Sequence, residues 1–124
     1  MAEHYRDLDV WKISMDLAVE VHKLLKLLPK EETYALSDQM RRSSTSIPTN
    51  IAEGYERNNV KEFVYFLRIA RGSRAELQTQ IFLCENFEYL TREQTAYALQ
   101  LTDLIGKKLY WLINHLQNKS NTNT

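Results

Sequence analysis

The residues best suited to bind a ligand are the basic side chains between positions 41 and 74. Seven lysines and arginines stand there against three glutamates, a local net charge of 7 − 3 = +4 in a chain with no formal net charge. Several recur in steps of three and seven, which returns them to overlapping faces of a helix. Such a row favours phosphate contact, with affinity falling as salt rises. The set is Arg41, Arg42, Arg57, Lys61, Arg68, Arg71 and Arg74.

The same arginines also allow a purely structural interpretation. They can pair with glutamates such as Glu56, Glu62 or Glu76, within one chain or between chains. Tyr55 and Tyr65 suit base stacking, but aromatic residues at helical spacing also build cores. The residues alone leave both interpretations open.

No arrangement of residues points to catalysis. The glutamate pairs at 53/56 and 85/88 lie one helical turn apart, yet no histidine follows a glutamate by three residues, as the carboxylate metal sites of helix bundles require. Cys84 sits in an apolar stretch typical of a buried, inert thiol. Ser46 and Ser73 lack a neighbouring base, and no glycine-rich phosphate loop is present. We expect a protein that is not an enzyme and takes no metal, cofactor or small-molecule substrate.

Composition indicates one helical domain. Of 124 residues, 44% are apolar and 26% charged, whereas only 3 glycines and 2 prolines are available for tight turns. No apolar run reaches the ~20 residues that a bilayer span needs, and the N-terminus lacks a signal core. The single cysteine excludes an intrachain disulfide. We therefore expect a soluble, cytoplasmic protein with no membrane partner.

Apolar residues at spacings of three and four predict four long helices that position the basic residues. The expected ranges are about 10–28, 34–57, 60–89 and 92–117. The expected N-caps are Asp9, Thr33, Asn59 with Glu62, and Thr91 with Gln94. Because the connections are short, successive helices should run antiparallel. We predict an all-α, up-down-up-down four-helix bundle over residues 1–117, followed by a polar, disordered tail at 118–124.

Pro48 falls inside the second predicted helix and would remove one of its hydrogen bonds. The apolar phase continues across it, so a continuous, bent helix is favoured over a loop at 43–50 between two short helices. We expect the hydroxyl side chains of residues 43–46 to bond to the carbonyls that the proline frees.

The third predicted helix carries more apolar surface than one bundle is expected to bury. From Phe63 to Ala70 only Arg68 interrupts a run of aromatic and aliphatic residues, which therefore point in nearly every direction. Contact with further copies of the chain would remove them from water, and a wide intramolecular core is the alternative. Asn50 and Glu53 are expected to hydrogen-bond across a close helix interface. The expected packing and interface residues are Asn50, Glu53, Gly54, Phe63, Phe66 and Gly72.

Three segments of the sequence resemble a known family. They are the run 36–47 leading into Asn50-Ile51-Ala52-Glu53-Gly54, the stretch 62–77 with Ala70-Arg71-Gly72-Ser73, and Asp9-Val10-Trp11. Over about residues 7–116 the chain is similar to the four-helix-bundle proteins encoded in intervening sequences of bacterial 23S rRNA genes. The resemblance implies a ring-shaped homopentamer without enzyme activity. A related branch, the accessory variability determinants of diversity-generating retroelements, binds nucleic acid and a reverse transcriptase; that branch is strongly basic, whereas this chain has a pI near 6.8.

Together these expectations define a predicted function. A cyclic oligomer would repeat the basic row around a rim. We expect a non-enzymatic, homo-oligomeric binding or scaffold protein whose basic rim contacts RNA, DNA or a nucleic-acid enzyme. The alternative is a protein-interaction adaptor that makes no nucleic-acid contact.

Overall fold

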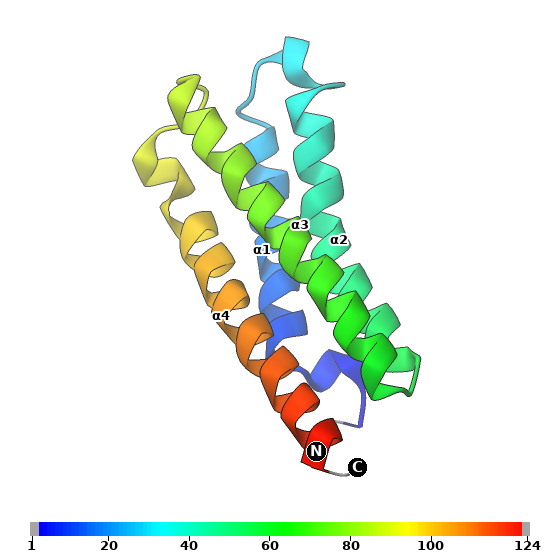
Figure 1. Ribbon diagram of the computed structural model, residues 1–124. Helices are drawn as coiled ribbons and strands as arrows, with labels where there is room; N and C mark the ends of the chain where they lie inside the picture. Colours follow the sequence, from blue (N-terminus) through cyan, green and yellow to red (C-terminus); the bar gives the residue numbers. More distant parts are fainter. Residues whose placement is uncertain (1–2, 123–124) are drawn as a thin grey trace.

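Four long helices, running in alternating directions, make up the protein (Figure 1). The computed structural model describes residues 3–122, and no strand occurs among them. The helices are α1 (Asp9–Leu25), α2 (Leu36–Glu56), α3 (Val60–Asn86) and α4 (Arg92–Thr122), with the short 3-10 turns η1 (Tyr5–Asp7) and η2 (Lys30–Glu32). Each helix packs on its neighbours in the chain, and α1 also packs on α4, so the bundle closes. The prediction of an all-α protein with four helices is confirmed.

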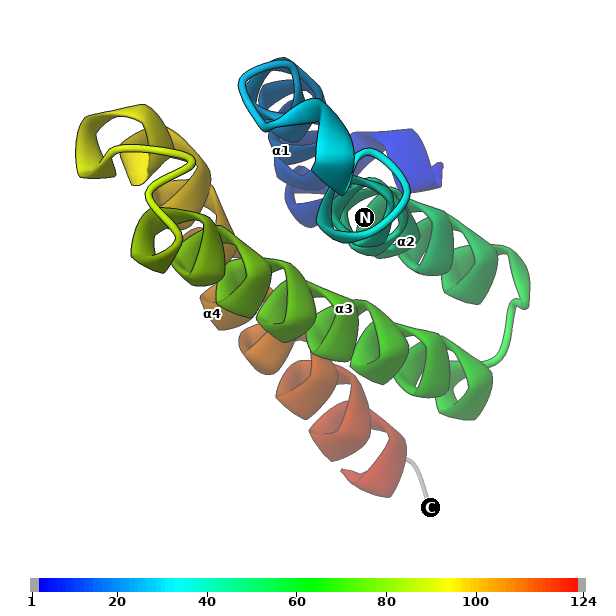
Figure 2. The ribbon, with the colours of Figure 1, turned by 90° about the horizontal axis from the view of Figure 1, so that it is seen from above.

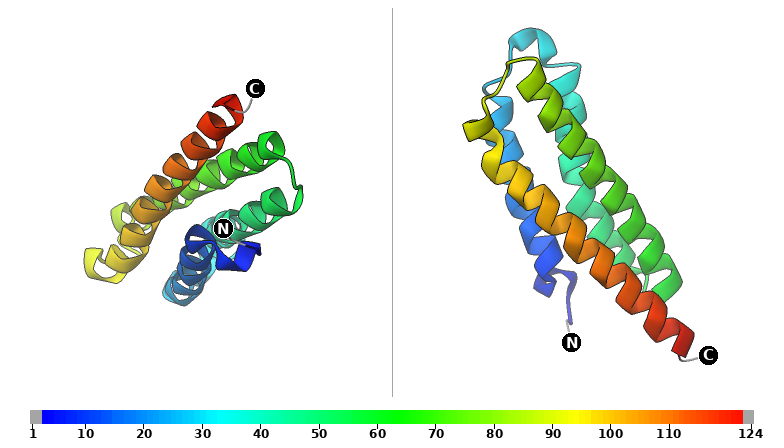
Figure 3. Two further views of the ribbon diagram at one scale, coloured as in Figure 1. Left: turned by 90° about the horizontal axis from the view of Figure 1, so that it is seen from below. Right: turned by 60° about the vertical axis from the view of Figure 1, so that its left-hand side comes forward.

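The helices lie in two layers when the bundle is viewed along its length (Figures 2 and 3). One layer holds α1 and α2, and the other holds α3 and α4. The apolar stripe of each helix faces the space between the layers, where the core forms. Its fully buried side chains include Leu17, Met40, Ile51, Leu77 and Ile105.

Both capping pairs predicted for α3 and α4 are present. At the start of α4 the N–H of Gln94 donates to Thr91 Oγ1 at 3.1 Å, and the N–H of Thr91 donates to Gln94 Oε1 at 2.9 Å. At the start of α3 the N–H of Glu62 donates to Asn59 Oδ1 at 3.0 Å. These bonds satisfy amide groups that have no partner within the helix.

The N-caps predicted for α1 and α2 are wrong. Leu8, without a side-chain bond, is the N-cap of α1, and Asp9 is already helical. α2 begins after Ala35, because Thr33 closes the preceding turn, where its N–H bonds to Lys30 O. A polar residue near a helix start is thus a cap only where the backbone turns at that residue.

Three predicted helix ends also shift. α1 ends at Leu25, because the following amides bond to carbonyls three residues back, and Leu27 N lies 2.9 Å from Leu24 O. α3 ends at Asn86, before Glu88 adopts a left-handed backbone with φ of 63°. α4 continues past 117 to Thr122, since no glycine or proline stands between residues 118 and 122. The part of the predicted tail at 118–122 is therefore helical, and residues 123–124 lie outside the described residues.

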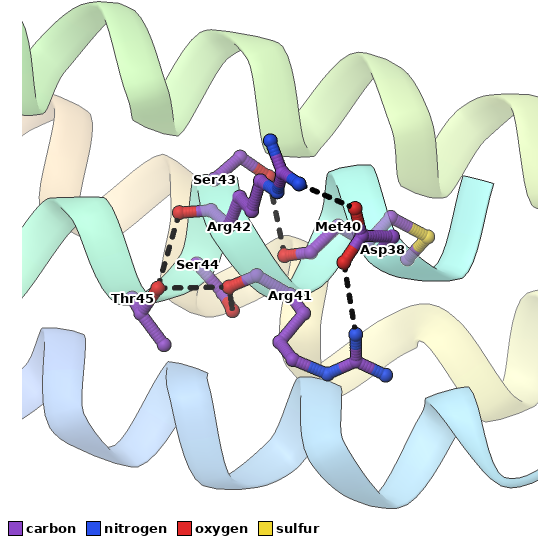
Figure 4. A network of polar contacts seen from close by, with 7 residues as sticks. All are labelled: Asp38, Met40, Arg41, Arg42, Ser43, Ser44 and Thr45. Carbon is purple, nitrogen blue, oxygen red and sulfur yellow. Dashed lines mark hydrogen bonds and ion pairs between the residues drawn. The ribbon is translucent and has the colours of Figure 1, made fainter. Parts of the chain in front are cut away.

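α2 runs unbroken through Pro48, which is buried, so the continuous-helix prediction is confirmed. The proline has no N–H to bond with the carbonyl of residue 44. The predicted compensation is wrong, because the hydroxyls of residues 43–45 donate to the carbonyls of residues 40–42 instead (Figure 4). Beside the proline, Thr49 Oγ1 donates to the carbonyl of residue 45 at 2.7 Å.

α2 and α3 approach each other closely at Gly54. A Cβ atom at this position would lie 2.7 Å from Phe66 Cβ and 3.3 Å from the Phe63 carbonyl oxygen. The first contact is closer than real Cβ atoms show and the second is tighter than most, so glycine alone fits without moving α3. Gly54 thus serves the packing role predicted for it.

Polar contacts between α2 and α3 come from serines. Ser43 Oγ donates to Gln80 Oε1 at 2.7 Å in the buried interface, and the hydroxyls of Ser46 and Ser73 lie 2.8 Å apart. The predicted hydrogen bond of Asn50 and Glu53 across the interface is wrong. The Asn50 amide donates to the Ser46 carbonyl, and Glu53 is exposed, because both residues lie at the edge of the buried face of their helix.

Candidate nucleic-acid interface

A cationic pocket lies on the outer side of α3 and α4. It has a volume of about 340 Å³ and is lined by Arg71, Arg74, Asp103, Gly106, Lys107 and Tyr110. Three cations and one carboxylate give this lining a formal charge of 3 − 1 = +2. Arg68 lies one turn before Arg71 on the same helix, which extends the positive charge along α3. We call Arg68, Arg71, Arg74, Lys107 and Tyr110 the α3–α4 basic surface.

Arg74 lies between the two helices, beneath the pocket. Its guanidinium occupies the space over Gly106, where an added Cβ would lie 2.7 Å from Nη1. Nη1 donates to the Thr102 carbonyl at 3.3 Å, whereas Nε is buried and has no hydrogen-bond partner among the described residues. Arg74 thus holds α3 against α4 and places positive charge below the pocket.

Arg71 and Tyr110 form one wall of the pocket. The Arg71 guanidinium carbon lies 5.0 Å from the centre of the Tyr110 ring, a cation–π contact that leaves the guanidinium N–H groups free to bind. Tyr110 remains 56% exposed. Asp103, which also lines the pocket, accepts a hydrogen bond from Gln78 at 2.8 Å.

Arg68 and Lys61 complete the basic residues of α3. Both are exposed, and neither makes an ion pair or a hydrogen bond within residues 3–122. An exposed guanidinium without a carboxylate partner gives up no existing interaction when it binds a phosphate. These two side chains are therefore the most available of the predicted phosphate contacts.

Arg41 and Arg42 of α2, and Arg57 at its C-cap, lie apart from this surface. Arg41 and Arg42 both pair with Asp38, at 3.2 and 3.0 Å. Figure 4 shows Arg41 extending towards α1 and Arg42 towards α3. Arg57 pairs with Glu53 at 3.1 Å and lies over the Phe66 ring. The structure thus places Arg68, Arg71 and Arg74 along one surface, and it gives Arg41, Arg42 and Arg57 carboxylate partners of their own.

Sequence reasoning missed Lys107 and Tyr110. They lie one turn apart on α4, on the side that faces Arg71, and the pocket is incomplete without them. Their spacing of three marks a common helix face. Pairing that face with Arg71 and Arg74 requires the register of α3 against α4, which no local pattern contains.

The family profile of the 23S rRNA-intervening sequence proteins matches residues 6–111. The chain belongs to this family. A similar solved structure is that of a protein of unknown function from the S23 ribosomal protein family of Bacteroides thetaiotaomicron, which is 32% identical. It superposes with a TM-score of 0.78 over 84% of this chain and 97% of the other. None of the curated proteins compared with the chain matches it.

In this family member, the predicted apolar interface is partly used within the chain. Phe63 and Phe66 are half-buried against the core or Gly54, whereas Tyr65 and Ile69 are 61% and 37% exposed. Gly72 is exposed, and an added Cβ would meet no atom within 4 Å, so it is not a point of close approach inside one chain. An interface between copies at these residues stays a prediction.

The remaining reactive groups of this family member lie in the core or stand alone. Burial raises the pKa of the Cys84 thiol to about 11, with a smaller contribution from the negative charge of Glu32. The thiol donates to Met40 Sδ at 3.6 Å. Residues 3–122 contain no group of three or more His, Cys, Asp or Glu side chains placed to hold a metal ion. No helix in the described part of the chain has the length and apolarity to span a bilayer.

Proposed function

We propose that this protein is a non-enzymatic, homo-oligomeric scaffold that binds nucleic acid through the α3–α4 basic surface. The observation that carries the proposal is the cationic pocket, where Arg71 and Lys107 are presented to solvent above the Arg74 guanidinium. Guanidinium groups bind phosphate oxygens through parallel N–H donors, which suits them to a nucleic-acid backbone. We place this binding in the cytoplasm, with RNA, DNA or a nucleic-acid enzyme as the partner.

Assembly into a ring-shaped homopentamer is part of the proposal. The resemblance described above implies such a ring, and exposed apolar side chains support contact between copies. Tyr65 and Ile69 on α3 and Met15 and Val19 on α1 are all more than a third exposed. Covering such groups with a second copy removes apolar area from water. A ring would repeat the α3–α4 basic surface around its circumference and so multiply weak phosphate contacts.

A protein-interaction adaptor is the second candidate function. It is favoured by a separate group of exposed apolar residues, Phe82, Leu83 and Phe87, at the end of α3. These side chains carry no charge and lie at the end of α3 that leads into α4, away from Lys61 and Arg68. Capture of a specific protein that is insensitive to salt and to changes at Arg71 would support the adaptor.

The proposal is tested by titrating the protein into labelled structured RNA between about 50 and 200 mM salt. Replacing Arg68 and Arg71 by Glu should weaken binding at least tenfold and reduce the salt dependence, by about one unit of slope per lost phosphate contact. Arg42→Glu is the matched control, because Arg42 already pairs with Asp38 and lies outside the pocket.

Light scattering of the same variants separates binding from assembly. The mass should remain that of the unaltered oligomer. A fall in mass would assign the arginines to the subunit interface, and absence of binding by the unaltered protein at low salt would reject the nucleic-acid proposal.

A further inference from the structure

Trp111 is the large aromatic residue of α4 that is most exposed, at 64%. It borders a mainly apolar pocket of about 330 Å³ between the start of α1 and the C-terminal half of α4. The pocket is lined by Leu8, Asp9, Val10, Lys107, Lys108, Trp111 and Leu112. An exposed indole beside an apolar hollow offers a flat surface on which another ring can lie.

The indole is held in a fixed orientation. The rings of Trp111 and His115 stack with an angle of 7° and a centroid distance of 4.9 Å. His115 stacks on the indole and is not among the residues that line the pocket, whereas Trp111 is. A ring entering the pocket would meet an indole that a second aromatic ring already supports.

Two lysines line the same pocket as this indole. Lys107 and Lys108 stand on the pocket wall, and the one acidic residue of the lining, Asp9, lies 3.8 Å from the Lys108 ammonium. Lys107 also lines the cationic pocket with Arg71 and Arg74, so the two pockets share a wall. Trp111 follows Lys107 by one turn, about 6 Å along the helix axis. The indole and the cationic pocket are thus no farther apart than the length of one nucleotide.

We infer that the occupant of these adjoining pockets is single-stranded nucleic acid. An unpaired base stacks on Trp111 in the apolar pocket, and the neighbouring phosphates contact Lys107 and the α3–α4 basic surface. The inference rests on the proposed function and deepens it by naming the kind of nucleic acid. The strand must be single, because in a duplex the neighbouring bases cover each base face. The positive charge beside the indole favours a polyanion over an apolar side chain from a second copy of the chain.

Binding of single strands and of a duplex by the full chain provides the test. The probes are labelled oligo-U, oligo-dT and a duplex of equal length, at low salt. Trp111→Ala should weaken binding of the single strands roughly tenfold and leave duplex binding unchanged, whereas Trp111→Phe should retain most of the affinity. Oligo-U should quench tryptophan fluorescence in the unaltered protein and much less in Trp111→Phe. A loss of affinity in Trp111→Ala for both strands, or for one of them, supports the inference and shows which of the two polymers the site accepts.

Tyr34→Ala is the matched control, because Tyr34 is 95% exposed and lies in the connection between η2 and α2. If Trp111→Ala binds like this control while Arg68→Glu still weakens binding, the stacking site is overturned and the proposed function stands. If the unaltered protein binds none of the probes, both fail. If Trp111→Ala lowers the mass of the oligomer without changing affinity, the occupant is a second copy and the inference is overturned.

Discussion

The two interfaces of α3 are built on opposite uses of glycine. Towards α2, Gly54 admits the backbone and Cβ atoms of α3, with Phe66 Cβ at 2.7 Å from a hypothetical side chain. Towards α4, Gly106 makes room for the Arg74 guanidinium, with Nη1 at the same distance. One glycine brings two helices together, and the other accommodates a charge between two helices.

This difference separates the side of α3 that stabilises the fold from the side that we propose for binding. The α2–α3 side is closed by small residues and by hydroxyl and amide groups that bond to each other, such as Ser43 to Gln80. The α3–α4 side is held by an arginine whose Nε has no hydrogen-bond partner in the described part of the chain, and it opens into a cationic pocket. A helix that carries both kinds of interface can present charge on one side because the other side fixes its position.

The largest effect is expected from adding atoms at Gly54. Gly54→Val should lower the free energy of unfolding by about 3 kcal/mol, because Phe66 Cβ and the backbone of α3 cannot move aside locally. Urea denaturation followed by circular dichroism measures the loss. Gly72→Val is the matched control, since an added Cβ there meets nothing within 4 Å and stability should not fall. An equal loss at position 72 with unchanged oligomer mass would contradict this account of the α2–α3 interface.

A smaller effect is expected from the buried hydrogen bond between α2 and α3. Ser43→Ala leaves Gln80 Oε1 buried without its donor and should cost about 1–2 kcal/mol. Combining it with Gln80→Leu removes both polar partners and should restore part of that loss. Equilibrium unfolding of the single and double variants gives the coupling energy. A double variant whose loss is the sum of the single losses would show that the two side chains are not coupled.

The smallest effect is expected at Gly106. The atoms that meet an added Cβ are the far end of Arg74, which can rotate away. Replacing a helical glycine by alanine favours the helix by about 1 kcal/mol, so Gly106→Ala should change stability by less than that amount. Urea denaturation of Gly106→Ala measures this change in stability. A loss as large as that at Gly54 would mean that α4 is packed as rigidly as α2.

The fold could be predicted from the sequence wherever the relevant residues are close together in the chain. The reciprocal pair of Thr91 and Gln94 predicted the start of α4, and the apolar phase predicted that α2 crosses Pro48. Errors arose where the type of a residue alone was taken to mark the start of a helix. Asp9 and Thr33 have capping side chains, but the backbone turns at Leu8 and Ala35 instead.

Only part of the candidate site was within reach of sequence reasoning. The basic residues of α3 were identified by spacing within one helix. Their partners Lys107 and Tyr110 depend on how two helices are aligned, and the pairing of Arg41 and Arg42 with Asp38 depends on rotamers. Asn50 and Glu53 were predicted to make a buried contact, but they lie at the edge of the buried face of α2. A small difference in the rotation of the helix decides between the edge and the interior of that face.

α4 is the longest helix, with 31 residues against 17 in α1, and its last turns reach the connection between α2 and α3. Leu116 and Lys119 border a hollow there with Tyr55 and Phe63. The family match stops at Trp111, so these turns lie past it. They lie beside the end of the bundle at which α2 connects to α3. Shortening the chain there would loosen the same stretch that orients the indole. Heat tolerance would then decline together with the base stacking that we propose at Trp111.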